Sequence, residues 1–172
     1  MKRVLIVVDM QNDFVYDALG SEDAQAIVPN VKKKIDKYLA NDDIVIFTRD
    51  THGANYLKTQ EGQKLPVPHC IYGTKGWCVI DELNNPECYH VDKGSFGYTM
   101  WEKDLSDNVE SIELCGVCTN ICVVSNALII KAQFPEIPVK VDRTCCAGTS
   151  AEAHDAALKT MESCQIEVYE EF

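Results

Sequence analysis

Short apolar runs rich in β-branched residues recur along this chain and alternate with segments of helical character. Residues 4–8, Val-Leu-Ile-Val-Val, end at Asp9 and are typical of a strand buried on both faces. Further strands are predicted at 43–48, 87–92, 111–115, 137–141 and 165–169, and helices at 27–41, 98–105, 119–132 and 150–161. This alternation predicts an α/β fold, a three-layer α/β/α domain of Rossmann-like type with a mainly parallel six-stranded sheet.

The length and charge of the chain limit its organisation and its partners. A length of 172 residues predicts one domain, residues 1–172. The apolar run at residues 4–8 is too short for a signal peptide, and no run reaches the roughly 18 residues of a membrane helix. We therefore expect a soluble, cytoplasmic protein with no membrane partner. The net charge of −11 repels phosphate backbones, which argues against nucleic acid as a partner.

Polar residues stand directly after most of the predicted strands. They are Asp9, then Arg49 and Asp50, then Asp92 and Lys93, then the segment 115–122, then Asp142 and Arg143. Ligands of parallel α/β sheets bind beyond the carboxyl ends of the strands. We therefore expect a carboxylate, a lysine and a group of cysteines to converge at one edge of the sheet.

Cys122 is the candidate nucleophile at this edge. It falls in the first turn of the helix predicted after the fourth strand, where the helix dipole lowers the pKa of a thiol, and a nearby Lys93 would lower it further. A thiolate attacks carbonyl carbons, and Asp9 could carry the proton between the thiol and a leaving group. The alternative interpretations are a buried structural cysteine, a turn-capping aspartate and a solvated lysine.

A candidate metal site follows the second predicted strand. Asp50 and His52 are two residues apart on extended chain, and His69 comes from the same long segment, 49–76, which is predicted as a loop. One carboxylate and two imidazoles suit Zn²⁺, Fe²⁺ or Mn²⁺ and leave coordination positions open. The alternative is that these are ordinary loop residues without a ligand.

The nine cysteines favour reduced thiols over a disulfide scaffold, because the number is odd and the chain has the apolar content of a normal core. Cys115 and Cys118 form a C-x-x-C pair between a strand and a helix, which is the position of thioredoxin-like redox motifs. The pair lies late in the chain without a flanking Trp or Pro, and a third cysteine follows at 122. These features argue against a redox pair, which is the main rival interpretation of this segment.

Three motifs, taken together, resemble the isochorismatase-like cysteine hydrolases over essentially the whole chain. The motifs are Val-Val-Asp-Met-Gln-Asn-Asp-Phe at 7–14, Lys-Gly-Ser-Phe at 93–96 and Gly-Val-Cys-Thr-Asn-Ile-Cys-Val at 116–123. The resemblance implies a catalytic set of Asp9, Lys93 and Cys122. It also implies a cis peptide bond between Val117 and Cys118, and an oxyanion hole made by the backbone amides of Cys118 and Cys122. This family usually has alanine where Cys118 stands.

Two further segments resemble the metal-binding, nicotinamidase-like branch of this family: Thr-Arg-Asp-Thr-His at 48–52 and Pro-His-Cys-Ile-Tyr-Gly-Thr at 68–74. The resemblance implies a divalent metal, zinc first and iron or manganese as alternatives, on Asp50, His52 and His69. We expect Phe14, Trp77 and Val117 to line the substrate pocket. Thr51 and Pro66 stand where this branch commonly has tryptophan, and Trp77 is the candidate replacement.

The activity implied by the resemblance is hydrolysis of a small carboxamide, through a thioester, with release of ammonia. The small-molecule amide is the expected partner, and we expect a homo-oligomer. Two rival functions remain at this point. One is a metal-free hydrolase of the same family that acts on another small substrate, and the other is a non-catalytic protein that binds thiols or metal.

Overall fold

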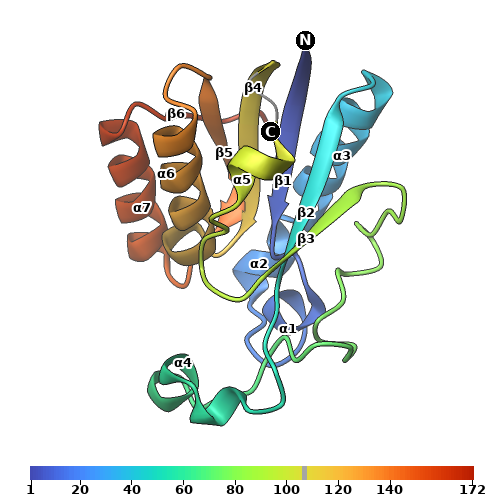
Figure 1. Cartoon of the computed structure of the whole chain (residues 1–172), viewed down its shortest axis with the longest axis vertical. Helices are drawn as coiled ribbons and strands as arrows, with labels where there is room; N and C mark the ends of the chain where they lie inside the picture. Colours follow the sequence, from blue (N-terminus) through green and yellow to red (C-terminus); the bar gives the residue numbers. More distant parts are fainter. Residues whose placement is uncertain (106–107) are drawn as a thin grey trace.

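The computed structural model describes residues 1–105 and 108–172, and it has a six-stranded, fully parallel sheet at its centre (Figure 1). The strand order is β3-β2-β1-β4-β5-β6. The strands are β1 (Lys2–Val8), β2 (Ile44–Asp50), β3 (Tyr89–Lys93), β4 (Val109–Val117), β5 (Val139–Ala147) and β6 (Glu167–Tyr169). The predicted fold class is confirmed.

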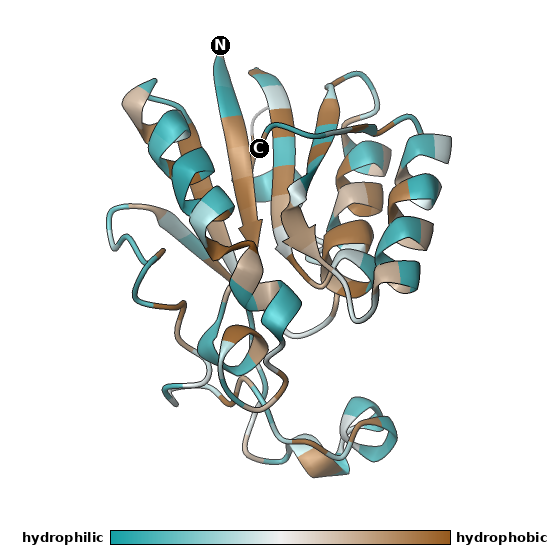
Figure 2. Ribbon diagram, turned by 180° about the vertical axis from the view of Figure 1, so that it is seen from behind, coloured by the Kyte–Doolittle hydropathy of each residue, from teal (hydrophilic) through white to brown (hydrophobic). Residues whose placement is uncertain are grey.

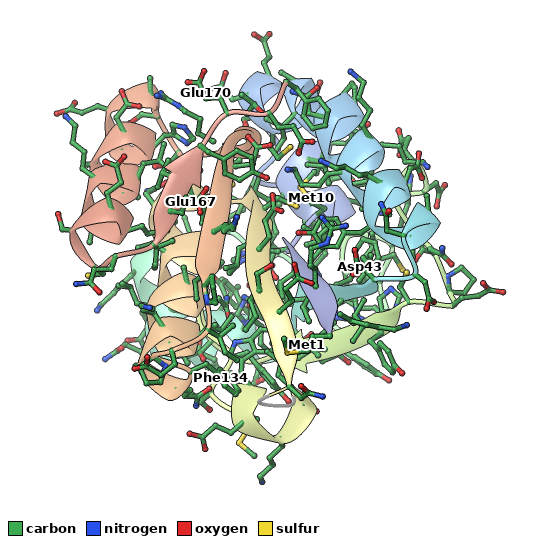
Figure 3. The ribbon with its side chains drawn as sticks, turned by 90° about the horizontal axis from the view of Figure 1, so that it is seen from above. Met1, Met10, Asp43, Phe134, Glu167 and Glu170 are labelled. Atoms are coloured by element: carbon green, nitrogen blue, oxygen red, sulfur yellow. The ribbon has the colours of Figure 1, made fainter. Side chains whose placement is uncertain are left out.

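Helices cover both faces of the sheet. Helix α3 (Val28–Ala40) packs against β1 and β2, whereas α6 (Val124–Gln133) and α7 (Ala151–Ser163) pack against each other and against β5 and β6 respectively. In Figure 3, where the sheet is seen from above, α3 and α6 lie on opposite sides of the strands. The short helix α5 (Trp101–Asp104) contacts α6. These helices form the two outer layers of the domain.

Strand β1 forms the middle of the hydrophobic core. Residues Val4 to Val8 are fully buried, and the strand pairs with β2 on one side and β4 on the other. Figure 2 shows the strand turning from hydrophilic at its start to hydrophobic toward its carboxyl end. Burial of a whole aliphatic side chain contributes roughly 1.5–3 kcal/mol, so this run fixes the depth and direction of the strand.

Several boundaries differ from the predicted ones. The segment 49–76 is not a continuous loop, because it contains η1 (Tyr56–Lys58) and α4 (Gln60–Lys64), and α4 begins with Thr59 accepting a hydrogen bond from the Gly62 amide. The helices α1 (Asn12–Val15) and α2 (Glu22–Ala26) were not predicted. Each of these helices has fewer than six residues, which is too short to show an apolar period.

Four predicted strand ends, those of β2, β3, β4 and β5, lie too early. Arg49 and Asp50 belong to β2 instead of following it, and β5 continues past residue 141 to Ala147. Asp142 and Arg143 are therefore inside β5. A charged residue within a strand normally marks its end, but the buried Asp142 is paired with Lys34 and the strand runs on.

The helix predicted at 119–132 begins with a π-turn. Thr119–Val123 forms this turn (η2), and α6 begins at Val124. The side chain of Thr119 does not cap the turn and instead contacts Nδ1 of His154 at 2.8 Å. Thr119 is therefore not the cap of this helix.

The described helices are all short. The longest two, α3 and α7, have 13 residues each. In residues 1–105 and 108–172 there is no helix with the length and hydropathy needed to span a bilayer.

A buried ion cluster joins α3 to the far half of the sheet. The Nζ atom of Lys34, which is fully buried, lies 2.6 Å from Glu113 Oε1, 2.8 Å from Asp142 Oδ2 and 2.7 Å from Glu171 Oε2. It also donates a hydrogen bond to the hydroxyl of Tyr169. Burial raises the pKa of Asp142, but the hydrogen bonds from Lys34 and Thr144 and the charge of Lys34 together outweigh burial, so the pKa lies below its usual value. The Lys34 ammonium thus holds α3, β4, β5 and the C-terminal segment together.

Removal of the Lys34 charge should destabilise the fold. In Lys34→Met, Glu113 and Asp142 keep their buried charges without a cation, so we expect a loss of about 3–5 kcal/mol in the free energy of unfolding, measured with urea. Lys32→Met is the control on the same helix. Its side chain is exposed and paired only with Asp36, so a change within about 0.5 kcal/mol is expected. Equal stability of the two variants would contradict the structural role of the cluster.

Candidate active site

The carboxyl ends of β1, β2, β3 and β4 meet at one edge of the sheet, and α1, α2 and α4 are gathered beyond it (Figure 1). Asp50 and Lys93 are register partners at the ends of β2 and β3. Asp9 follows β1 with a positive φ of 50°, a left-handed conformation that aspartate tolerates better than most residues. The Gln11 amide then donates to the Asp9 carbonyl oxygen at 2.7 Å, which turns the chain away from the strand.

Lys93 is the buried cation that links the predicted site residues. Its Nζ atom lies 2.7 Å from Asp9 Oδ2, 3.4 Å from Asp50 Oδ1 and 3.5 Å from Cys122 Sγ. It also donates a hydrogen bond to the Ser95 carbonyl at 3.1 Å. Burial lowers the pKa of Lys93, but the negative charges around it, that of Asp9 foremost, together outweigh this effect and raise the pKa, so the ammonium stays protonated. The structure thus brings Asp9, Lys93 and Cys122 together.

Cys122 is a neutral thiol at rest. Burial raises its pKa well above the ordinary cysteine value, and the charge of Asp9 adds to this, against the opposing charge of Lys93. Lys93 lowers this pKa, as predicted, but the predicted net decrease was wrong, because the thiol is only 4% exposed and faces a carboxylate.

Asp9 is the acceptor beside this thiol. Burial also raises its pKa, whereas the charge of Lys93 lowers it. Its Oδ1 atom accepts a hydrogen bond of 2.6 Å from the Thr48 hydroxyl, which fixes the carboxylate plane. Asp9 is thus held between Lys93, Thr48 and the thiol.

The peptide bond between Val117 and Cys118 is cis, as the resemblance implied. Cys118 directly precedes the π-turn, and its carbonyl oxygen accepts hydrogen bonds from the amides of Ile121 and Val123. Cys118 and Cys122 therefore lie at the two ends of one tight helical turn. The C-x-x-C partner Cys115 lies in β4 and is fully buried in the core.

Four side chains of the segment 49–76 form a group that can hold a metal ion. They are Asp50, His52, Glu61 and His69, with ligand atoms all within 4.8 Å of one another. Asp50 Oδ2 lies 2.9 Å from His52 Nε2 and 3.6 Å from His69 Nε2, and Glu61 Oε1 lies 3.7 Å from both imidazole nitrogens. Sequence reasoning found three of these residues and missed Glu61. Its only sequence signal was its position in the same long segment, 49–76, as the other three.

The chemistry and spacing of this group fit a divalent cation. Ligands at about 2.0–2.2 Å from one tetrahedral ion lie roughly 3.3–3.6 Å apart, close to the measured separations. Nδ1 of His69 donates to the Val67 carbonyl at 2.8 Å, so its Nε2 presents a lone pair to the group. Burial raises the pKa of Asp50, but its bonds with His52 and His69 outweigh burial and lower the pKa. Asp50 is thus available as a carboxylate ligand.

A cavity of about 420 Å³ opens between the cysteine and the metal group. Cys118, Cys122 and Val117 line one part of it, and Asp50, Glu61 and His69 line another. Most of the remaining wall is apolar, with Phe14, Leu19, Leu65, Phe96 and Ile121. Among the described residues, no lysine or arginine contributes to the lining.

Trp77 is not among the residues that line this cavity. Its indole N–H donates to the Thr51 hydroxyl at 2.9 Å, and its ring packs under the guanidinium of Arg49 at 4.0 Å and beside Tyr72. It therefore does not take the place of the tryptophan that Thr51 and Pro66 replace. Phe14 lines the cavity and packs against the His69 ring at 5.4 Å.

The parallel α/β domain, with a cysteine-lined cavity beside a candidate metal group, has matches among known proteins. The model of the Isochorismatase domain matches residues 3–170. The chain therefore belongs to the isochorismatase domain family.

Relatives and solved structures agree with this assignment. A nicotinamidase of Schizosaccharomyces pombe is 28% identical, with 97% of this chain and 92% of that protein covered. The crystal structure of a nicotinamidase/pyrazinamidase from Bacillus subtilis is 25% identical, has a TM-score of 0.87 and covers 99% of this chain and 100% of its own. A pyrazinamidase of Pyrococcus horikoshii, solved in complex with zinc, is 25% identical with a TM-score of 0.83 and covers the same shares.

Metal content tests the group of four. We expect about one divalent ion per chain in the purified protein, because four converging ligands outcompete water. His52→Ala and Glu61→Gln should lower the content, with the larger loss for the histidine, as measured by elemental analysis. His90→Ala, a control histidine stacked on Phe47 away from the group, should keep it. A native protein without metal would contradict the site.

Proposed function

We propose that this protein hydrolyses a small, uncharged carboxamide to a carboxylic acid and ammonia through a thioester on Cys122. The observation that carries the proposal is the contact of Lys93 Nζ with Asp9 and Cys122 beside one apolar cavity. The nicotinamidase and pyrazinamidase relatives support the amide as the substrate class. We also propose that residues 1–172 form a single hydrolase domain, since the family match spans 3–170.

In the first half of the reaction, the Cys122 sulfur attacks the amide carbonyl carbon. The thiol is neutral at rest, so its proton passes to the Asp9 carboxylate as the C–S bond forms. Lys93 keeps the charge of Asp9 balanced before the transfer. The backbone amides of Cys118 and Cys122 are the proposed donors to the tetrahedral oxyanion, and such donors contribute roughly 3–4 kcal/mol each.

In the second half, the C–N bond breaks and the departing nitrogen takes the proton from Asp9, which releases ammonia and leaves the thioester. Asp9 is then a carboxylate again and accepts a proton from the attacking water. The C–S bond then breaks, and Asp9 gives this proton to the sulfur as the free acid leaves. Each residue returns to its starting state, and the net change is addition of one water to the amide.

Asp50, His52, Glu61 and His69 are the residues that would hold a metal ion, and we propose zinc. When bound, a divalent ion supplies an electrophilic position for a lone pair of the substrate or of water. The protein orients the ligands: Lys93 contacts Asp50, and the Val67 carbonyl fixes the tautomer of His69. The metal-containing pyrazinamidase structure supports the choice of zinc.

The charge of the cavity separates this proposal from its rivals. The wall of the cavity carries two carboxylates but, within the part of the chain that is described, no lysine or arginine. A substrate with several carboxylates of its own would find no lysine or arginine on this wall to pair with them, whereas a neutral amide needs none. The organised ligand group argues against a metal-free hydrolase, and the contact of the thiol with Lys93 beside Asp9 argues against a passive thiol-binding protein.

Substitution of the nucleophile should abolish hydrolysis. We expect Cys122→Ala to lower the rate of ammonia release from a panel of small amides by at least about 10³-fold, because no other group forms the thioester. Far-ultraviolet circular dichroism should show that the fold is retained.

Cys118→Ala is the matched control in the same turn. Only its backbone amide takes part, so we expect a change of less than about threefold. If Cys118→Ala loses as much activity as Cys122→Ala, the C-x-x-C interpretation replaces the nucleophile assignment.

Asp9 and Lys93 should act as one unit with the thiol. Asp9→Asn and Lys93→Met each remove one side of the ion pair, so each should lower kcat/KM by roughly 10²-fold or more, and the double variant should lose little beyond that. Steady-state kinetics of the four proteins measures the coupling. Losses that multiply in the double variant would show that the two residues act independently.

A further inference from the structure

We infer that Gln11 and Asp13 are positioning residues for the metal ligands, an inference that rests on the proposed metal site. Neither residue contributes a ligand or lines the cavity. Each instead holds the main chain of a segment that carries ligands. Both belong to the short stretch that follows Asp9.

The Gln11 side chain holds Asp50 by bonding both the backbone amide and the backbone carbonyl of Asp50. The side chain of Gln11 is fully buried. Its Nε2 atom donates to the Asp50 carbonyl at 2.9 Å, and its Oε1 atom accepts from the Asp50 backbone amide at 2.7 Å. The same NH₂ group donates to the Trp77 carbonyl at 2.8 Å. Both main-chain hydrogen bonds of the first ligand residue therefore run to one side chain, which fixes the direction in which its carboxylate leaves the strand.

Asp13 holds the segment that carries His69. Its Oδ2 atom accepts a hydrogen bond of 2.7 Å from the amide of Cys70, the residue after His69. Cys70 has a left-handed backbone, with φ of 46°, which costs a non-glycine residue free energy unless a partner holds it. The Cys70 carbonyl in turn accepts from the His52 amide at 3.0 Å. One carboxylate thus supports the residue that joins the two histidine segments.

The space around Asp13 is shaped for this contact. A Cβ atom at Gly76 would lie only 2.1 Å from Asp13 Oδ2, so the carboxylate lies directly against the glycine. The Asp13 amide donates to the Gly76 carbonyl at 3.0 Å. The neighbouring Asn12 side chain donates to the carbonyls of Lys75 and Cys78. The stretch from Gln11 to Asp13 is therefore bonded along the whole loop that follows His69.

The consequence for the metal is preorganisation. Asp50, His52 and His69 come from a strand end and two loop segments, so without these bonds the ion would have to order them when it binds. Changes to groups that orient ligands typically lower metal affinity by about 10–100-fold. We expect that range here, with the ligands themselves unchanged.

The test is the dissociation constant of Zn²⁺, measured by chelator competition after removal and reloading of the metal. Gln11→Glu places a carboxylate oxygen against two carbonyl oxygens, and Asp13→Ala removes the acceptor of the Cys70 amide. Both should weaken Zn²⁺ binding by about 10–100-fold. Asp13→Asn keeps a carbonyl oxygen for Cys70 and should stay within about threefold of the native protein.

Gln165→Glu and Asp17→Ala, both at exposed positions, are the matched controls and should leave binding unchanged. Co²⁺ is the second probe. In Asp13→Ala its visible absorption spectrum should change, since the spectrum follows ligand geometry, whereas Asp13→Asn should restore the native spectrum. A loss of fold stability alone would lower the affinity for Zn²⁺ but would not produce this change and recovery of the Co²⁺ spectrum.

The outcomes are distinguishable. A native protein that binds no Zn²⁺ overturns the metal site and this inference with it. If the native protein binds Zn²⁺ and both Gln11→Glu and Asp13→Ala bind it with the same dissociation constant, only the positioning role is overturned. If Gln11→Glu does not fold, the Asp13 pair decides, and equal weakening by Asp13→Asn and Asp13→Ala overturns the role of the Cys70 hydrogen bond.

Discussion

The site depends on the contacts that the buried ammonium group of Lys93 makes with its neighbours. Lys93 is 2% exposed, and a buried cation is stable only with charge and hydrogen-bond partners around it. Asp9, Asp50 and the Ser95 carbonyl provide them, and the Cys122 sulfur completes the contact. The nucleophile and the first metal ligand are therefore within about 7 Å of each other because both touch the same nitrogen atom. Loss of this cation would leave two carboxylates buried without balance.

Parallel pairing explains how distant residues reach this point. Register places Asp50 beside Lys93 on the neighbouring strands β2 and β3, and pairs Val8 with Thr48 and with Gly116. Strand β1 therefore delivers Asp9 between the end of β2, which lies next to Lys93, and the end of β4, which leads to Cys122. A shift of one residue in any strand would send these side chains to the opposite face. The fully buried run from Val4 to Val8 prevents such a shift, so the core and the site are specified by the same register.

The sequence was sufficient for the sheet and for most of the site, because both depend on strong local patterns. Short apolar runs predicted all six strands, and the polar residues that follow them predicted that Asp9, Lys93 and Cys122 meet at one edge. It was insufficient where tertiary contacts overrule local pattern: β5 runs through Asp142 because Lys34 neutralises it, and Glu61 joins the metal group from a five-residue helix. The pKa of Cys122 was mispredicted for the same reason, since burial and Asp9 outweigh the charge of Lys93.

The stretch from Asp9 to Phe14 shows how one short segment can serve two chemical tasks. Asp9 faces Lys93, Gln11 binds the Asp50 main chain, Asp13 binds the Cys70 amide, and Phe14 packs on the His69 ring. The stretch thus supplies the proton acceptor, Asp9, and the side chains that contact the segments of the metal ligands. Because the segment follows five fully buried residues of β1, neither task can shift relative to the other without moving this strand. The geometry between the thiol and the ligand group is therefore set by the core of the fold.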